Sequence, residues 1–278
     1  MTKGLICIDI DGTLTADRQR VSTRVVDYIT KLSEAGYRLL FVTGRTFSWS
    51  MHLLQSFDIP YVLACLNGAY IIAMPGKRLV RSHDIALAEL MALQPLVDGV
   101  ACAQILLTSP VSNEVSFLYD KQVPDMLKVH LQARKLALQE EWTPIDTLEA
   151  ITQDSFAALR IFCAPSDAER LAGQIVQSSG LQAASMRDSY DSRFSVVQVT
   201  ASQASKGHAL QEIVAEEGIA GPIIACGDDR NDISMFSIAD CSVVMATALP
   251  DVLQHADIIA PPAENDGLIA GLDQALRW

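Results

Sequence analysis

Short apolar runs alternate with amphipathic segments at the start of the chain. Residues 5–10, 37–43 and 61–68 are predicted strands with apolar runs, and residues 23–35 place Val25, Ile29 and Leu32 at helical spacing. Such a strand–helix–strand order needs crossover connections, which favour parallel strands with helices on both faces of the sheet. The pattern therefore predicts an α/β protein with a doubly wound, Rossmann-like parallel sheet.

The same alternation returns near the C-terminus, whereas the middle of the chain has a different character. Helices are expected over 205–218, 232–239 and 266–276, and strands over 222–229, 241–248 and 257–260. In the middle, strand-like segments predominate, at 103–109, 114–120, 158–164 and 194–200, with one long helical segment at 123–138. We expect a core of residues 1–83 and 200–278, interrupted by an inserted α+β cap domain of residues 84–199.

Composition narrows the classes of partner and location. A net charge of −12 and a pI near 4.8 disfavour nucleic acid, whose binding depends on Lys and Arg. The six cysteines are scattered singly, as expected of buried thiols in a reducing compartment. No stretch approaches the ~20 apolar residues of a membrane helix. We expect a cytoplasmic protein that binds neither nucleic acid nor membrane and is a monomer or homodimer.

Polar residues gather where the predicted strands end. Asp9 and Asp11 follow the first strand, Thr43–Arg45 follows the second, Lys206 begins a helix, and Gly227–Asp232 follows a later strand. The carboxyl ends of parallel strands meet at one edge of a sheet, where ligands bind. Several carboxylates there need a cation, and oxygen ligands of this kind suit Mg²⁺, which leaves positions open for phosphate. The pattern predicts a substrate that carries a phosphoryl group.

These segments also carry a family resemblance. "DIDGT", "VTGR", "SKGHAL" and "GDDRND" resemble, in order, the four motifs of the haloacid dehalogenase superfamily of phosphatases. The position of the insert resembles the class IIB cap of the Cof-like sugar-phosphatase subfamily, and "NGA", "FSVVQVTASQASKG" and "NDGLIAGL" match that subfamily as well. The resemblance implies Mg²⁺-dependent hydrolysis of a phosphate monoester, most readily a sugar phosphate, through an aspartyl-phosphate, with the cap choosing the substrate.

The resemblance assigns roles to individual residues. Asp9 would be the nucleophile, and Asp11 the general acid and base whose backbone carbonyl also contacts the metal. Thr43 and Lys206 would stabilise the transferring phosphoryl group. The remaining assignments are metal binding for Asp9, Asp11, Asp228 and Asp232, and phosphate or substrate binding for Gly12, Gly44, Arg45, Asn67 and Asn231. Thr13 would fix the turn after Asp11, and the role of Asp229 stays open.

Taken singly, these motifs have ordinary structural explanations, and only the complete set is specific. Asp-x-Asp-Gly-Thr alone is an equally good turn or helix cap. Two other functions stay open. One is a phosphomannomutase-like phosphoryl transfer, whose second phosphate site would be formed by Arg160, Arg187 and Arg193. The other is a binding protein of the same fold without turnover. Apolar residues of the insert, such as Phe117 and Met126, are expected in its core.

Overall fold

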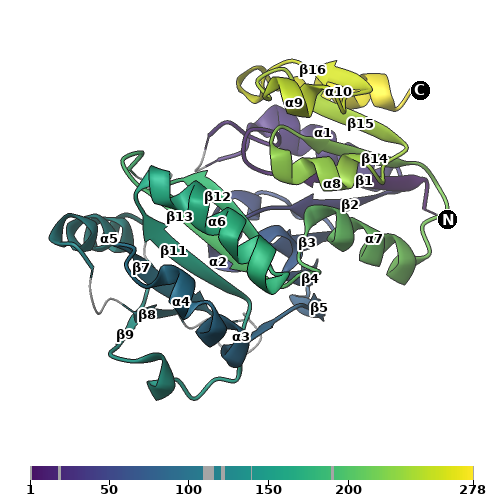
Figure 1. Ribbon diagram of the computed structural model, residues 1–278. Coiled ribbons are helices and arrows are strands. Elements are labelled where there is room, and N and C mark those ends of the chain that lie inside the picture. Colours follow the sequence, from purple (N-terminus) through teal and green to yellow (C-terminus); the bar gives the residue numbers. More distant parts are fainter. Residues whose placement is uncertain are drawn as a thin grey trace. The chain divides into compact units, whose positions relative to one another are not determined.

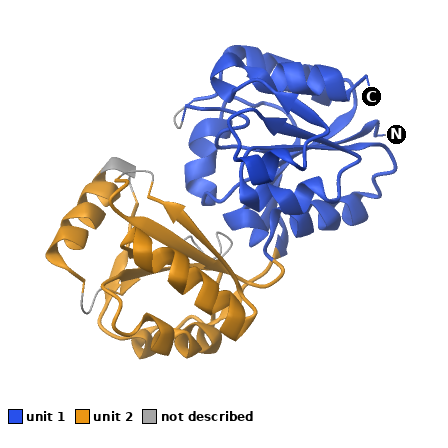
Figure 2. Cartoon of the chain, turned by 45° about the horizontal axis from the view of Figure 1, so that its top comes forward, with its two compact units in different colours: residues 1–81, 204–278 blue, residues 82–203 orange. Residues whose placement is uncertain are grey.

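The computed structural model describes residues 2–17, 20–108, 116–119, 123–138, 140–188 and 191–277 (Figure 1). It divides into two compact units, residues 1–81 with 204–278 and residues 82–203 (Figure 2). The sequence-based boundaries at 83/84 and 199/200 differ from these by a few residues. Within the described residues, no helix is both long and apolar enough to cross a membrane.

The first unit is built on an eight-stranded sheet with the order β16-β15-β14-β1-β2-β3-β4-β5. Its strands are β1 (Gly4–Asp9), β2 (Tyr37–Val42), β3 (Tyr61–Cys65), β4 (Tyr70–Met74), β5 (Arg78–Ser82), β14 (Ile223–Gly227), β15 (Cys241–Met245) and β16 (Ile258–Ala260). All pairs from β16 to β3 are parallel. The predicted α/β fold class is thereby confirmed.

One edge of the sheet departs from the parallel prediction. β4 pairs antiparallel with β3, because only the short 3-10 turn Leu66–Gly68 and one further residue separate them. A parallel return would need a crossover of a dozen or more residues. The hairpin strands β4 and β5 were not predicted from the sequence.

Helices cover both faces of this sheet. They are α1 (Thr23–Glu34), α2 (Phe47–Leu54), α7 (Lys206–Glu217), α8 (Ile233–Phe236), α9 (Pro250–Leu253) and α10 (Gly267–Ala275). Leu210 of α7 and Met235 of α8 share one apolar cluster with Val244 of β15. Neighbouring Val243 faces the opposite side, where the Gly271 backbone of α10 lies against it. Both faces are therefore buried, as a doubly wound sheet requires.

The second unit contains a six-stranded sheet with the order β12-β13-β11-β7-β8-β9, and a small separate pair of β6 and β10. The strands are β6 (Ile85–Ala86), β7 (Ala103–Leu107), β8 (Ser116–Tyr119), β9 (Thr143–Ile145), β10 (Ser155–Phe156), β11 (Ala158–Cys163), β12 (Gln182–Arg187) and β13 (Ser195–Thr200). The helices are α3 (Leu87–Ala92), α4 (Gln94–Val97), α5 (Asp125–Leu138) and α6 (Pro165–Ser179). All pairs in the large sheet are antiparallel except β8 with β9, which gives an α+β unit.

The two faces of the second sheet are covered differently. Leu171 and Ile175 of α6 pack in one apolar cluster with Ile161 of β11. On the opposite face, His130 and Arg134 of α5 lie near the Phe162 ring. Phe117 is in the apolar cluster, as expected, but the prediction for Met126 is wrong: its side chain is 62% exposed on α5. Its neighbour Leu127 is buried instead, because the helix turns Met126 away from the sheet.

Candidate active site

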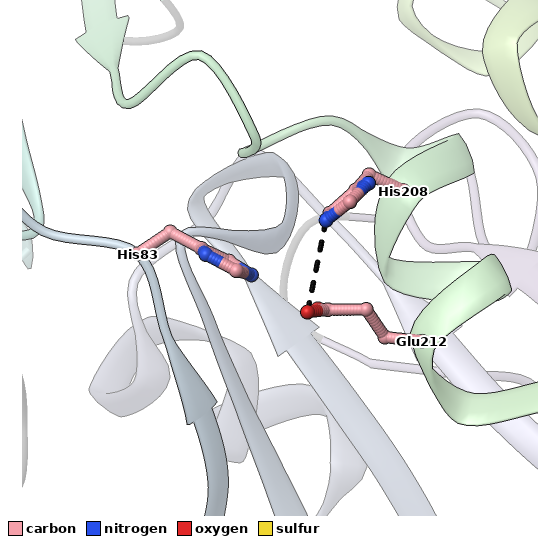
Figure 3. A group of neighbouring side chains, drawn as sticks. All are labelled: His83, His208 and Glu212. Carbon is pink, nitrogen blue, oxygen red and sulfur yellow. Dashed lines mark ion pairs between the residues drawn. The ribbon is translucent and has the colours of Figure 1, made fainter. Parts of the chain in front are cut away.

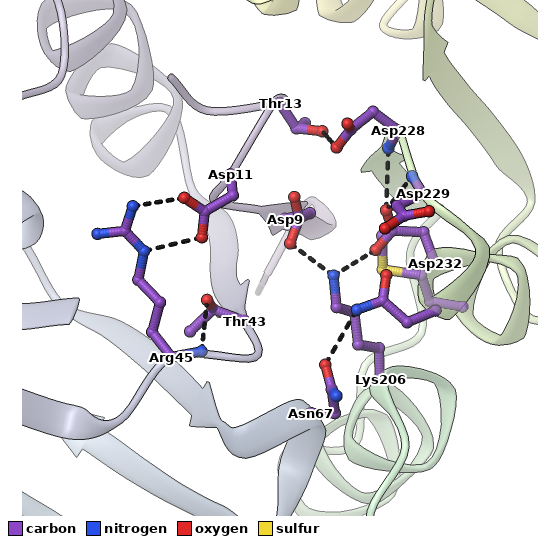
Figure 4. Close-up of polar contacts among 12 residues, drawn as sticks. Asp9, Asp11, Thr13, Thr43, Arg45, Asn67, Lys206, Asp228, Asp229 and Asp232 are labelled. Carbon is purple, nitrogen blue, oxygen red and sulfur yellow. Dashed lines mark hydrogen bonds and ion pairs between the residues drawn. The ribbon is translucent and has the colours of Figure 1, made fainter. Parts of the chain in front are cut away.

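Two carboxylates and one ammonium group form the centre of the candidate site. Lys206, at the first position of α7, donates to Asp9 Oδ1 at 2.5 Å and to Asp232 Oδ1 at 2.6 Å (Figure 4). All three side chains are nearly or fully buried. Asp9 ends β1, whereas Asp232 follows β14, the strand paired with β1. The parallel pairing thus brings residues 9 and 232 together across the length of the chain.

Asp228 joins this centre from the loop after β14. One carboxylate oxygen from each of Asp9, Asp228 and Asp232 lies within 4.8 Å of the others. Asp232 Oδ2 accepts hydrogen bonds from the backbone N–H groups of Asp228 and Asp229, both at 2.9 Å. Because both Asp232 oxygens already have donors, Asp9 and Asp228 are the better candidates for direct cation ligands.

Charge and burial explain the proton positions at this centre. Burial raises the pKa of Asp9, and the Lys206 ammonium opposes that rise. Burial disfavours the charge on Lys206, but Asp232 and Asp9 outweigh it and raise the pKa of the ammonium above its usual value. Burial and the nearby Asp232 raise the pKa of Asp228 to about 6. The raised pKa values of Asp9 and Asp228 reflect burial and crowded negative charge, which a divalent cation would relieve.

The turn after Asp11 is shaped by a close approach to Asp228. Gly12 has φ +83°, and a Cβ there would lie 2.6 Å from Asp228 Cγ. Thr13 Oγ1 donates to Asp228 Oδ1 at 3.0 Å, so its side chain bonds across to the candidate metal ligand rather than within its own turn. Gly12 and Thr13 therefore position Asp228. The sequence predicted the turn but not this contact, since the residues are 215 positions apart.

Asp11 and Arg45 form a separate ion pair on the other side of Asp9 (Figure 4). Arg45 was predicted to bind phosphate or substrate, yet its side chain is only 1% exposed. The guanidinium group stacks on Trp49 of α2, with Cζ 4.1 Å from the ring. Trp49 was missed from the sequence, because Arg45 lies before the start of α2 and helical spacing does not predict their contact.

The loops after β2 and β3 are joined by backbone hydrogen bonds. The Thr43 hydroxyl is fully buried and accepts from the Arg45 N–H at 3.1 Å, with Gly44 lying between them in the loop. The Thr43 carbonyl accepts from the Asn67 N–H at 2.8 Å. Asn67 has φ +58°, a strained backbone that such contacts hold in place.

Asn67 and Asn231 also meet at the site. Asn231 Nδ2 donates to Asn67 Oδ1 at 3.1 Å, and Asn231 Oδ1 is buried without a hydrogen-bond partner among the described residues. A buried carbonyl oxygen of this kind suits a donor or cation supplied by a ligand. Every residue predicted for the site thus lies at the carboxyl ends of the central strands or in the loops and helix that meet them.

A second group of polar side chains lies on α7, away from the buried centre. His208 Nε2 is 3.6 Å from Glu212 Oε1, one helical turn further along (Figure 3). Both side chains are partly exposed. The spacing of four residues is that of an ordinary stabilising pair on a helix surface.

Comparison with known proteins relates this chain to hydrolases and phosphatases. A family model described as haloacid dehalogenase-like hydrolase matches residues 6–272. The pyridoxal phosphate phosphatase YbhA of Escherichia coli is 22% identical over 96% of this chain and 97% of its own length. The Bacillus subtilis 5-amino-6-(5-phospho-D-ribitylamino)uracil phosphatase YitU is 23% identical, covering 95% and 94%. The solved HAD subclass IIB sugar phosphatase BT4131 has TM-score 0.75 at 21% identity, covering 98% of both chains.

Proposed function

The chain belongs to the haloacid dehalogenase-like hydrolase family, and from this we propose that it is a Mg²⁺-dependent phosphatase that hydrolyses a small phosphorylated metabolite through an aspartyl-phosphate. This membership confirms the family resemblance that the sequence motifs indicated. The observation that carries the proposal is the buried Lys206 between Asp9 and Asp232, with Asp228 close enough to share a cation. A nucleophile, a phosphate-neutralising cation and a metal-binding carboxylate are then within reach of one phosphorus atom.

The donor set fits Mg²⁺. Asp9 and Asp228 offer hard carboxylate oxygens, and the Asp11 backbone carbonyl is a further donor in this assignment. Asp232 holds the Asp228 backbone through its own hydrogen bonds and would act through the loop or through water. When bound, Mg²⁺ neutralises phosphate oxygens and polarises the phosphorus.

The protein side chains carry the reaction in two steps. Asp9 attacks phosphorus while Asp11, which enters this step protonated, gives its proton to the leaving oxygen, and the P–O bond to the alcohol breaks. Asp11 then takes a proton from water, which attacks the aspartyl-phosphate and releases inorganic phosphate and free Asp9. Lys206 neutralises charge next to the nucleophile, and Thr43 and Asn231 bind phosphoryl oxygens.

The substrate is a phosphate monoester of a small metabolite, with a sugar phosphate as the first candidate. Relatives of this chain include phosphatases for pyridoxal phosphate and for a phosphoribitylamino-uracil, and a solved structure of similar fold is a sugar phosphatase. We assign the choice of substrate to the second unit, residues 82–203, because the core motifs all serve the transferred phosphoryl group. A screen of phosphorylated metabolites with phosphate detection tests this assignment.

The experiment that tests the function uses p-nitrophenyl phosphate. Wild type is expected to release phosphate only with Mg²⁺, and Asp9→Asn to abolish release. Asp229→Asn is the matched control, since Asp229 is next to Asp228 but its side chain caps the following turn through the Arg230 N–H. Release without a divalent cation, or turnover by Asp9→Asn, would refute the assignment.

A further inference from the structure

The guanidinium of Arg45 uses both oxygens of the Asp11 carboxylate. Nε donates to Asp11 Oδ2 at 2.8 Å, and Nη2 donates to Oδ1 (Figure 4). The Arg45 side chain is 1% exposed, whereas that of Asp11 is 49% exposed. Paired bonds of this type fix the orientation of a carboxylate as well as its distance. The buried Arg45 therefore orients the more exposed Asp11 carboxylate.

Arg45 is itself fixed on three sides. Its guanidinium stacks on the Trp49 ring at 4.1 Å. Its backbone N–H donates to Thr43 Oγ1 at 3.1 Å, and its carbonyl accepts from the Leu66 N–H at 2.9 Å. These contacts tie the Arg45 backbone to the loops after β2 and β3, and the guanidinium to the first turn of α2. The Asp11 carboxylate thus has a rigid partner.

Asp9 and Asp11 are paired with different cations. Lys206 contacts Asp9, and Arg45 contacts Asp11 from the opposite side, so the two carboxylates point apart (Figure 4). In the proposed reaction, Asp11 must offer an oxygen first to the leaving alcohol and then to water. Each carboxylate oxygen has a second lone pair, so Asp11 can exchange a proton while both bonds to Arg45 hold its orientation. Arg45 is therefore placed to orient Asp11 through both transfers.

Resting on the proposed function, we propose that Arg45 is a positioning residue that orients Asp11 for proton transfer, and not a ligand of the substrate. An arginine that binds substrate phosphate keeps N–H groups directed at the ligand, as in a bidentate phosphate contact. Here the Nε and Nη2 donors are directed at Asp11, and the side chain is almost completely buried. The Trp49 ring supports this orientation from α2.

The test separates catalysis from binding. Arg45→Met preserves most of the buried side-chain volume, and Arg45→Lys retains a charge but not the paired bonds. For a hexose phosphate, whose alcohol needs a proton on leaving, we expect kcat of Arg45→Met to fall roughly 10–100-fold and KM to change less than about twofold. Arg45→Lys should be intermediate, and Trp49→Leu should change kcat in the same direction.

A double-mutant comparison shows whether Arg45 acts through Asp11. In the Asp11→Asn background, Arg45→Met is expected to lower the first-turnover rate of hexose release from the hexose phosphate by less than about twofold, against roughly 10–100-fold in the wild-type background. Affinity for inorganic phosphate, measured by calorimetry in the presence of Mg²⁺, requires no turnover and should stay within about twofold in Arg45→Met. Circular dichroism and thermal melting establish that each variant is folded.

Other outcomes would overturn the proposal. A tenfold loss of phosphate affinity or a tenfold rise of KM with unchanged kcat would make Arg45 a substrate ligand. Equal losses from Arg45→Met in the wild-type and Asp11→Asn backgrounds would show that Arg45 does not act through Asp11. Failure of the proposed function is distinguishable, because it appears as Mg²⁺-independent activity or as turnover by Asp9→Asn.

Discussion

Replacing Gly12 with alanine should damage the candidate metal site more than the fold. Gly12 has φ +83°, where an L-residue costs roughly 1–2 kcal/mol. The new Cβ would also lie 2.2 Å from Asp228 Oδ2 and 2.6 Å from Cγ, against 3.4 Å or more in ordinary contact, so the carboxylate must retreat by about 1.2 Å. Metal–ligand distances tolerate only ~0.2 Å, and a displacement of this size is therefore expected to weaken Mg²⁺ binding roughly 10–100-fold.

Gly218 provides the matched control for this prediction. It also has positive φ, +61°, but a Cβ there would meet nothing within 4 Å. Both Gly12→Ala and Gly218→Ala should lose stability in urea denaturation, because both strain the backbone. Only Gly12→Ala should require more Mg²⁺ for half-maximal hydrolysis of p-nitrophenyl phosphate. A wild-type Mg²⁺ requirement in folded Gly12→Ala would refute the role given to this close approach.

Three further perturbations test charge and burial. Lys206→Met leaves two buried carboxylates without their shared cation, so it should destabilise the metal-free protein by about 3–5 kcal/mol. It should also lower kcat at least ~100-fold, and near-normal turnover would contradict the role of Lys206. The pKa of Asp228 is about 6 in the folded protein, against 3.8 in the unfolded chain, so the folded state binds the carboxyl proton more tightly. The metal-free protein should therefore lose stability as the pH rises from about 4 to 6. Mg²⁺ replaces that proton, so its effect on Tm should be larger at pH 8 than at pH 5, and an equal effect would count against Asp228 as a ligand. In the second unit, Asp188→Ala removes a fully buried carboxylate 2.8 Å from Arg134 and should lower the free energy of unfolding in urea by about 2–4 kcal/mol. Asp167→Ala, which removes one partner of an exposed ion pair, should change that free energy little. Equal losses of stability in the two variants would refute the importance given to the buried pair.

Features that repeat along the chain were predictable from the sequence. Periodic apolar positions located β1, α1 and β2, because burial on a fixed face leaves a spacing that can be read directly. β12, at Gln182–Arg187, lacks such a signal, since its residues apart from Met186 are small or polar and none is buried. The β3–β4 hairpin depends on the length of a turn, which hydrophobic spacing does not record.

The identity of the site residues was predictable, whereas their partners were not. Asp9 and Lys206 could be grouped because the topology of a parallel sheet sends strand ends to one edge. The direction of the Arg45 side chain toward Asp11 was not predictable from the sequence, since its rotamer depends on packing against Trp49. Topology predicts which residues share an edge, but side-chain packing decides which of them touch.

The central claim is that carboxylates from opposite ends of the chain share one divalent cation. Its most direct test is an anomalous-difference map from crystals grown with Mn²⁺ in place of Mg²⁺. The account predicts one strong peak bonded, at roughly 2 Å, to carboxylate oxygens of both Asp9 and Asp228. A peak bonded to neither, with the site otherwise ordered, would contradict it.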